Sequence, residues 1–251
     1  MEPVAGRLKI LDIWVDPVDM NLALKRVVEF VEQGARPHSV FAVNPEKNFS
    51  VPKDLDLYKH FRNADLLIPD GIGIVVAARI LHGTRLSRVP GVELMGNICN
   101  LAARKGYKVF LYGAKEEVSR IAAEKLSERY PALTIAGRAS GYVREEEMPA
   151  LVESINNSGA EILFLALGSP KQEKWFATYG PSLTTVRVCQ GIGGTLDTIA
   201  GNVKRAPEIW CRWNLEWLYR LLSDPRRLKR QKDLPVFASK VLLAKIGWGG
   251  K

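Results

Sequence analysis

The amino-acid sequence predicts an α/β protein, with a parallel-sheet core followed by a helical, basic C-terminal appendage. Over residues 7–194, short apolar runs alternate with amphipathic stretches of helical periodicity, which is typical of a parallel sheet covered on both faces. After about residue 204 this alternation ends. Residues 204–251 contain twelve Lys or Arg and four acidic residues, so they carry +8 of the chain's net charge of +9. We therefore expect a core over residues 1–203 and an appendage over residues 204–251.

Seven apolar runs are the expected strands of the core. In chain order they are residues 8–15, 39–44, 65–70, 108–113, 133–139, 161–168 and 186–194. Their short length and their separation by helical stretches favour a parallel sheet over a sandwich or a barrel.

The expected helices between these strands carry end signals. After the first strand, Asp16 is the expected N-cap, Pro17 takes the first helical position and Gly34 stops the helix. The stretches 115–131 and 144–159 begin with several acidic residues, which the helix dipole favours at an N-terminus. These signals support the helical interpretation of the stretches between the strands.

Polar and small residues follow the strands. The loops are VNPEKN (43–48), PDGIG (69–73), YGAKEE (112–117), SGYVRE (140–145), GSPKQE (168–173) and GIGGTLD (191–197). In open α/β sheets, ligands bind at the carboxyl ends of the strands. We therefore expect the binding site at this edge of the sheet.

The composition favours a soluble globular protein and disfavours membrane-spanning, disulfide-rich and zinc-binding proteins. The chain has 251 residues, 47% of them hydrophobic and 25% charged, which is ordinary for a soluble globular protein of one large domain, with or without an appendage. Its apolar runs fall below the roughly 18 residues of a membrane-spanning helix, and the N-terminus does not read as a signal peptide. The three Cys and three His are scattered, without the spacing of a disulfide framework or a zinc site. A reducing cytoplasm is the expected location.

The stretch LLIPDGIGI (66–74) ends an apolar strand with a carboxylate that two glycines follow. Two interpretations of Asp70 are open from the residues alone. Asp70 is either the N-cap of the following helix or a general base at the mouth of the sheet. In the second interpretation, Gly71 and Gly73 allow a substrate to approach the backbone closely.

Dehydrogenase chemistry is disfavoured. GIGIVV (71–76) has Val76 where a dinucleotide fingerprint needs its third small residue, and it follows the third strand rather than the first. GIGGTLD is no better as a fingerprint, because too little chain remains for a complete βαβ unit. The chain also contains no Walker A motif.

The triplet Asp54-Leu55-Asp56 has the form of the metal-binding DxD motif of some sugar transferases. It lies in residues 51–65, however, which have the pattern of an amphipathic helix. The residues expected to face inward are Leu55, Leu57, Tyr58 and Phe61. We therefore expect the two acids on a solvated face and no metal site.

The appendage combines aromatic and cationic residues. Its aromatic residues Trp210, Trp213, Trp217 and Tyr219 precede a basic run over residues 226–232. This combination suits an anionic membrane interface or a partner surface, and it also suits single-stranded nucleic acid. A docked core helix with a charged outer face is the third interpretation. The residues alone favour the membrane or partner surface.

Taken together, these motifs resemble the WecG/TagA/CpsF family of bacterial glycosyltransferases. The similar segments are NPEKN, PDGIG, GSPKQE and the run from GGTLDTIAGNVKRAP to EWLYRLLSDPRRLKR, within a match from about residue 7 to 235. The resemblance implies a Rossmann-like core that binds a UDP-sugar. It further implies inverting, metal-independent transfer, without a cofactor, onto a polyprenyl-diphosphate-linked saccharide at the cytoplasmic membrane face.

The resemblance also assigns roles to individual residues. It implies that Asp70 is the catalytic base and that Asn44, Arg88 and Gln172 are further active-site residues. Family members often have Thr two positions before the asparagine, whereas this chain has Ala42. Because that hydroxyl is missing, the donor sugar stays open among N-acetylmannosamine, its uronic acid and glucose.

The remaining site residues are implied by the nucleotide-binding loops and the appendage. Tyr142 and Asp197 match the loops, with a merely local structural role as the alternative for both. Arg220, Arg227 and Arg230 match appendage arginines that are thought to reach the site, where guanidinium groups suit the diphosphate of UDP.

The sequence thus favours a UDP-sugar transferase of cell-surface polysaccharide or teichoic-acid biosynthesis. We expect it to be peripheral on the inner face of the bacterial membrane, to contact anionic lipid through its appendage, and to have no nucleic-acid partner. The alternative is a non-catalytic basic module that binds nucleic acid or a membrane surface. The oligomeric state is open, and a homo-oligomer is compatible with the sequence.

Overall fold

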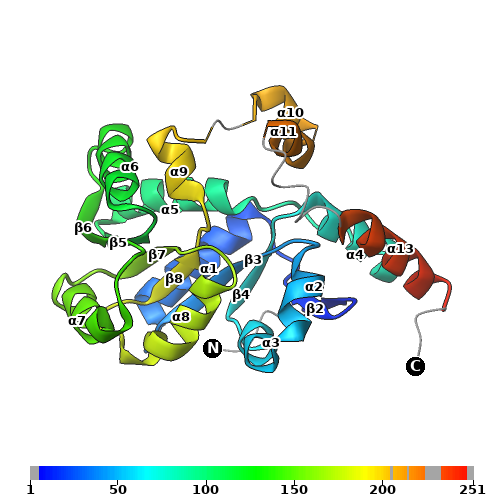
Figure 1. The fold of residues 1–251 in the computed structure, drawn as a ribbon, viewed down its shortest axis with the longest axis horizontal. Coiled ribbons are helices and arrows are strands. Elements are labelled where there is room, and N and C mark those ends of the chain that lie inside the picture. The colour runs from blue at the N-terminus through cyan, green and yellow to red at the C-terminus, as the bar shows by residue number, and fades with distance from the viewer. Residues whose placement is uncertain (1–5, 204–205, 214, 224–232, 248–251) are drawn as a thin grey trace.

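Six strands form one parallel sheet in the computed structural model, which describes residues 6–203, 206–213, 215–223 and 233–247 (Figure 1). The strand order is β4-β3-β8-β7-β5-β6, and every neighbouring pair is parallel. The strands are β3 (His38–Val43), β4 (Leu66–Pro69), β5 (Lys108–Gly113), β6 (Thr134–Ala139), β7 (Ile162–Ala166) and β8 (Val188–Gly191). Six of the seven expected strands are therefore confirmed.

Helices flank this sheet. In the core they are α1 (Met20–Gln33), α2 (Lys47–Ser50), α3 (Leu55–Arg62), α4 (Ile72–His82), α5 (Gly91–Lys105), α6 (Glu116–Arg129), α7 (Met148–Asn157), α8 (Lys171–Tyr179) and α9 (Thr195–Ala200). Short 3-10 turns lie at η1 (Val51–Lys53), η2 (Glu145–Glu147) and η3 (Gly180–Ser182). The C-terminal segment contains α10 (Glu208–Arg212), α11 (Glu216–Ser223) and α13 (Asp233–Lys245).

Alternate residues of the strands enter different hydrophobic cores. Val40 of β3 packs in a core that also contains residues of α1, α5, α6 and α9. The next residue, Phe41, packs on the opposite face in a core with residues of α3 and α4. Further along the sheet, α7 and α8 cover that second face. Because strand side chains alternate between faces, both sides are buried and the predicted α/β, Rossmann-like class is confirmed.

The first expected strand is wrong as a single strand. Residues 8–15 form a separate antiparallel hairpin of β1 (Leu8–Ile10) and β2 (Ile13–Val15). The chain reverses at Leu11, whose φ of 55° lies in the left-handed region. The apolar residues Ile10, Ile13 and Val15 are nevertheless fully buried, because the hairpin packs with α3 and α4.

The N-cap expected for α1 is also wrong. Asp19 caps the helix by accepting a hydrogen bond from the Leu22 backbone N–H, at 2.8 Å. Asp16 is instead fully buried, accepting from Arg7 Nε at 2.6 Å and from the Leu67 backbone N–H at 2.7 Å. A buried carboxylate needs such partners, and the distant residues that supply them cannot be recognised from local sequence. The predicted stop at Gly34 is confirmed.

The predicted helix over residues 51–65 is shorter than expected, but its predicted inward face is confirmed at three of the four residues. Tyr58 is partly buried against the same core as Leu57 and Phe61. Leu57 and Phe61 are buried as predicted, but Leu55 is 74% exposed. Because α3 begins at Leu55, this residue lies about 200° around the helix from the buried stripe. Asp54 caps the helix by accepting from the Leu57 N–H at 3.1 Å, and it pairs with Lys174 at 2.5 Å.

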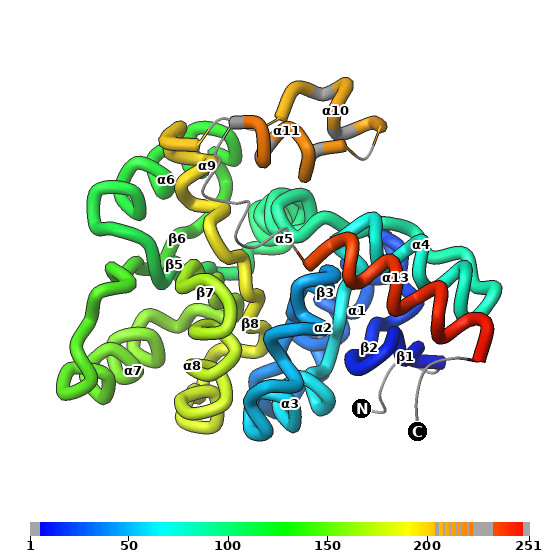
Figure 2. Tube along the Cα trace, turned by 45° about the vertical axis from the view of Figure 1, so that its right-hand side comes forward, coloured from blue at the N-terminus to red at the C-terminus, as the bar shows by residue number. Residues whose placement is uncertain are grey.

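The C-terminal segment returns to the core. In both views α10 and α11 lie together at one side of the molecule, while α13 runs along α4 (Figure 2). The division of the chain at residue 203 stays a prediction. Among the described residues, no helix is both long and apolar enough to cross a bilayer.

Candidate active site

A cavity of about 780 Å³ opens at the carboxyl ends of neighbouring strands. Its lining includes Asn44 after β3, Asp70 after β4, Gln172 at the start of α8 and Gly191 at the end of β8. These strands are adjacent in the order β4-β3-β8-β7, and β3 and β8 are neighbours although β4 to β7 separate them in sequence. In α/β proteins such a place in the topology is a preferred ligand site.

Most of the predicted site residues lie in this cavity. Residues from five separate segments line it, namely Asn44, Asp70, Arg88, Gln172 and Asp197. Their approach to one another follows from parallel strands ending at the same edge of the sheet. No local contact in the sequence could bring residues 44 and 197 together.

The remaining predicted residues are placed differently. Tyr142 lies in the loop after β6, is 72% exposed and is not among the residues that line the cavity. Arg220 belongs to α11. Arg227 and Arg230 lie outside the described residues. The roles of these residues stay predictions.

The structure fixes Asp70 through both its backbone and its side chain. Its N–H donates to the Val43 carbonyl at 3.1 Å, and its own carbonyl accepts from Arg88 Nε at 2.8 Å. The carboxylate oxygen Oδ1 accepts from the backbone N–H of Gly91, the first residue of α5, at 3.0 Å. The positive end of the α5 dipole favours a negative charge at this position.

The interpretation of Asp70 as the cap of the following helix is wrong. The N-cap residue of α4 is Gly71, one position later, and it makes no side-chain capping bond. Asp70 therefore lies outside α4 while its side chain lines the cavity. This arrangement leaves the carboxylate at the cavity wall, where a ligand hydroxyl can reach it.

The two glycines after Asp70 have a packing role that the sequence did not indicate. A Cβ atom on Gly71 would lie 2.9 Å from Pro45 Cδ, and one on Gly73 would lie 2.6 Å from Pro45 Cγ. The glycines therefore allow the first turn of α4 to pack directly against the loop that carries Asn44. Their smallness serves protein packing at these contacts, and because both glycines also line the cavity, the expected close approach of a substrate stays a prediction.

Gln172 links α8 to the glycine-rich loop after β8. Its Oε1 accepts from the Gly193 backbone N–H at 3.0 Å. A Cβ on Gly191 would lie 2.4 Å from Gln172 Nε2, so only glycine leaves room for this amide. The buried Gln172 side chain thus positions the loop that leads to Asp197.

A buried ion pair lies beside these residues, and sequence reasoning missed it. Lys47 and Glu173 are 5% and 1% exposed, and the Lys47 ammonium donates to Glu173 Oε1 and to Ser169 Oγ. The second carboxylate oxygen of Glu173 has no hydrogen-bond partner among the described residues. The signal was present in the sequence, because Lys47 belongs to NPEKN and Glu173 to GSPKQE, two of the motifs that carry the family resemblance.

The ion pair joins the two loops that carry the predicted amide residues. Asn44 Oδ1 accepts from the Lys47 backbone N–H at 3.3 Å, and Gln172 Nε2 lies 3.5 Å from Glu173 Oε1. Both Lys47 and Ser169 also line the cavity. Asn44 and Gln172 are therefore held relative to one another through a continuous polar network.

Asp197 lies in the first turn of α9, with its side chain at the cavity wall. Its backbone carbonyl accepts from the N–H groups of Asn202 at 2.9 Å and Val203 at 3.2 Å. The residue therefore combines a position in the site with a structural role at the end of α9.

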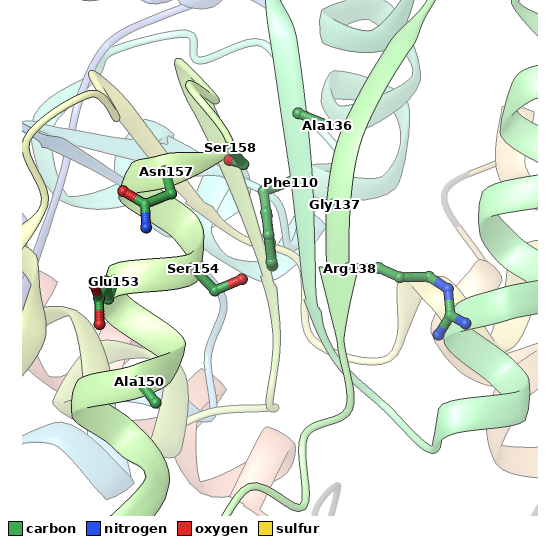
Figure 3. Close-up of a pocket in the computed structure, with 9 residues that line it drawn as sticks. All are labelled: Phe110, Ala136, Gly137, Arg138, Ala150, Glu153, Ser154, Asn157 and Ser158. Atoms are coloured by element: carbon green, nitrogen blue, oxygen red, sulfur yellow. The ribbon is translucent and has the colours of Figure 1, made fainter.

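A second hollow, of about 550 Å³, lies between β6 and α7 (Figure 3). Its lining is dominated by small residues and includes none of the predicted site residues. Arg138 points away from the other labelled side chains, and its guanidinium pairs with Glu116 of α6.

In the part of the chain that the structure describes, no group of three His, Cys, Asp or Glu residues is placed to hold a metal ion.

Comparison with known proteins adds independent information. The sequence model of a protein family described as "Glycosyl transferase WecG/TagA/CpsF family" matches residues 8–249 of this chain. A Bacillus subtilis (strain 168) protein named N-acetylglucosaminyldiphosphoundecaprenol N-acetyl-beta-D-mannosaminyltransferase is 38% identical over 227 residues, covering 89% of this chain and 88% of its own. A Bacillus spizizenii protein of the same name is 34% identical over 203 residues, covering 81% and 78%.

Proposed function

This chain belongs to the WecG/TagA/CpsF family of glycosyl transferases, and on that premise we propose that it moves a sugar from a UDP-sugar to a polyprenyl-diphosphate-linked saccharide. The observation that carries the proposal is the cavity at the strand ends, which gathers Asn44, Asp70 and Gln172. Its volume suits a nucleotide-sugar, because ligand sites commonly measure about 300–1,000 Å³.

Asp70 is the catalytic base in this proposal. The acceptor hydroxyl gives its proton to the Asp70 carboxylate while its oxygen attacks the anomeric carbon of the donor sugar and the bond to UDP breaks. A single displacement of this kind inverts the anomeric centre, so an α-linked donor yields a β-linked product. The names of the two Bacillus relatives print a β-linked transfer. Removal of the proton by a positioned carboxylate typically contributes about 10²–10⁴-fold to the rate.

The departing UDP carries negative charge that the protein must stabilise. In this proposal guanidinium groups, rather than a metal ion, stabilise that charge, since Arg binds phosphate through two parallel hydrogen bonds. Arg220, Arg227 and Arg230 are the candidates from the C-terminal segment. Tyr142 and Asp197 are the candidates for contacts with the nucleotide, and Asp197 can accept from uracil or ribose.

The transferred sugar is most simply N-acetylmannosamine. Both named relatives transfer this sugar to N-acetylglucosaminyldiphosphoundecaprenol, and they match most of the chain. Ala42, which lines the cavity beside Asn44, offers no hydroxyl to the donor. The uronic acid of N-acetylmannosamine and glucose are therefore the comparison donors in any assay.

The C-terminal segment is proposed to contact an anionic membrane at its cytoplasmic face. Ile209, Trp213 and Leu222 are 61%, 72% and 67% exposed, in a segment rich in Lys and Arg. Exposed aromatic and aliphatic side chains together with cations are typical of interfacial membrane binding. Cosedimentation with anionic vesicles, compared with zwitterionic vesicles, tests this part of the proposal.

The decisive experiment supplies the purified protein with a UDP-sugar and a lipid-linked acceptor in the presence of EDTA. UDP-N-acetylmannosamine, its uronic acid and UDP-glucose are compared on N-acetylglucosaminyl-diphospho-undecaprenol, with product detection by mass spectrometry. A product with one added sugar that persists in EDTA supports metal-independent transfer. Absence of product with all three donors, or its complete loss in EDTA, contradicts the proposal or its metal-independent form.

A further inference from the structure

The helix α13 forms one wall of the cavity together with α4. The two helices lie side by side although about 150 residues separate them in sequence (Figure 2). Phe237 and Val241 are 4% and 2% exposed and belong to the same hydrophobic core as α4. The Phe237 ring lies near Gly73, where an added Cβ would be 3.7 Å from Cε1. This packing fixes which face of α13 borders the cavity.

The surfaces that these helices present to the cavity are entirely apolar. From α4 the lining residues are Ile72, Gly73, Val76, Ala77 and Ile80, and from α13 they are Leu234, Phe237, Ala238, Val241 and Leu242. Each set spans nine residues of helix, so its first and last residues lie about 12 Å apart along the helix axis. The two sets therefore form an apolar trough that begins at Gly71, next to Asp70, and extends along both helices.

Part of this trough is exposed to solvent. Val76 and Leu242 are 49% and 58% exposed, although both line the cavity. Elsewhere on α13 the helix contacts other parts of the chain, as Lys240 does with the ring of Phe49 at 5.3 Å. Apolar side chains that remain accessible inside a ligand cavity indicate a ligand that is itself apolar at that end.

The cavity thus divides into a polar and an apolar part. The polar part contains Asn44, Asp70 and Arg88, and the apolar part is the trough between α4 and α13. A UDP-sugar is polar throughout and suits only the first part. An acceptor of the proposed class has a polar sugar diphosphate joined directly to a hydrocarbon chain, which matches the division of the cavity.

We propose that the trough between α4 and α13 binds the first isoprene units of the acceptor's polyprenyl chain, next to the diphosphate. This inference rests on the proposed function and adds a binding site to it. The trough holds the chain while the acceptor sugar lies at Asp70, so the protein selects its acceptor partly by the length of the hydrocarbon.

The first test compares two acceptors that share the sugar diphosphate but differ in the lipid, one undecaprenyl and one with a short alkyl group. Leu242→Gln and Val76→Thr make the trough more polar at exposed positions, where folding is little affected. Because each buried methylene contributes roughly fourfold to binding, each variant is expected to lower kcat/KM about tenfold for the undecaprenyl acceptor. Neither variant is expected to change kcat/KM for the short acceptor.

The matched control is Leu243→Gln, the same substitution one residue later on α13. Leu243 is 39% exposed and does not line the cavity. Equal losses with both acceptors, or an equal loss in Leu243→Gln, overturn the inference and leave the transferase function standing. Absence of product from the unaltered protein with every acceptor instead counts against the proposed function.

A second measurement tests the trough without catalysis. An undecaprenyl diphosphate carrying a photoreactive group near the diphosphate is crosslinked to the unaltered protein, and the labelled peptides are identified by mass spectrometry. Labelling within residues 72–80 and 234–242 supports the inference. Labelling confined to residues 208–223, or to bulk lipid alone, overturns it.

Discussion

Lys47 and Glu173 form a buried ion pair that connects the loop after β3 with the first turn of α8. The two residues lie 126 positions apart, and each belongs to the loop or helix turn that carries a predicted site residue, Asn44 or Gln172. Removal of one partner leaves the other charge buried, whereas an apolar replacement of both removes the charge altogether. The pair therefore contributes to the fold and to the arrangement of the site at once.

Substitution of Lys47 is expected to destabilise the protein strongly. Lys47→Met leaves the Glu173 carboxylate buried without its cation, which typically costs about 3–5 kcal/mol. The double variant Lys47→Met with Glu173→Leu is expected to recover much of that loss. Urea denaturation provides the free energies. The matched control is Lys174→Met, which breaks the more exposed pair with Asp54 and is expected to cost at most about 1 kcal/mol. Similar losses for the two single variants would contradict this prediction.

Substitution of Asp70 is expected to slow turnover without unfolding the protein. In Asp70→Asn the side-chain carbonyl still accepts from the Gly91 N–H, but the amide cannot remove a proton. We expect turnover to fall by at least about tenfold, with donor binding largely retained. Steady-state kinetics and calorimetric titration with UDP separate the two effects. Asp56→Asn, on the exposed surface of α3, is the control and should leave turnover unchanged. A decrease of less than tenfold would refute the assignment of Asp70 as the base.

The close contact between Gly73 and Pro45 predicts that a larger residue at position 73 lowers the stability of the protein. In Gly73→Ala the new Cβ would lie 2.6 Å from Pro45 Cγ, so α4 or the Asn44 loop has to move. Such overpacking typically costs about 1–3 kcal/mol. Thermal and urea unfolding measure the loss. The control is Gly96→Ala in the middle of α5, where the new Cβ would lie 3.4 Å from the Tyr130 hydroxyl. We expect this variant to be neutral or slightly stabilising. The prediction fails if the two alanine variants unfold alike.

Asp65 should make the free energy of unfolding depend on pH at acid pH. Burial of this carboxyl opposes its ionisation, but hydrogen bonds from His38, Arg36 and the Ser39 backbone outweigh burial and lower its pKa to about 2. Because this pKa is below its ordinary value of 3.8, the stabilisation is present above pH 4 and is lost as the pH falls toward 2.

The shift corresponds to about 2 kcal/mol of stability near neutral pH. Urea unfolding of the unaltered protein and of Asp65→Asn should therefore differ clearly at pH 6 and converge toward pH 2. A difference that is constant between these pH values would show that ionisation of Asp65 is not its source.

Local patterns in the sequence were enough to predict the class of fold and the edge of the sheet at which the cavity lies. Strands buried on both faces read as continuous apolar runs, so the six strands of the sheet could be located within a few residues. Parallel strands place their carboxyl ends at one edge. For that reason Asn44, Asp70 and Gln172 could be expected together from the sequence, and all three line the cavity.

Other features depend on residues that are distant in the chain and meet only in the folded protein. Asp16 could not be distinguished from a helix cap, because its actual partners Arg7 and Leu67 come from other elements. The role of Gly73 depends on Pro45, and the charge of Lys47 is balanced by Glu173. Burial, ion pairing and steric contact depend on distances between segments, which local periodicity does not encode.

The apolar trough likewise combines features that local sequence predicts with a contact that only long-range packing creates. The residue pattern alone shows that α4 is largely apolar and that the C-terminal segment is rich in aromatic, aliphatic and basic residues. It did not determine that residues 234–242 would lie against α4 and complete the wall of the cavity beside Asp70. That arrangement follows from burial of Phe237 and Val241 in a core shared with α4, a long-range packing contact that only the folded chain can form.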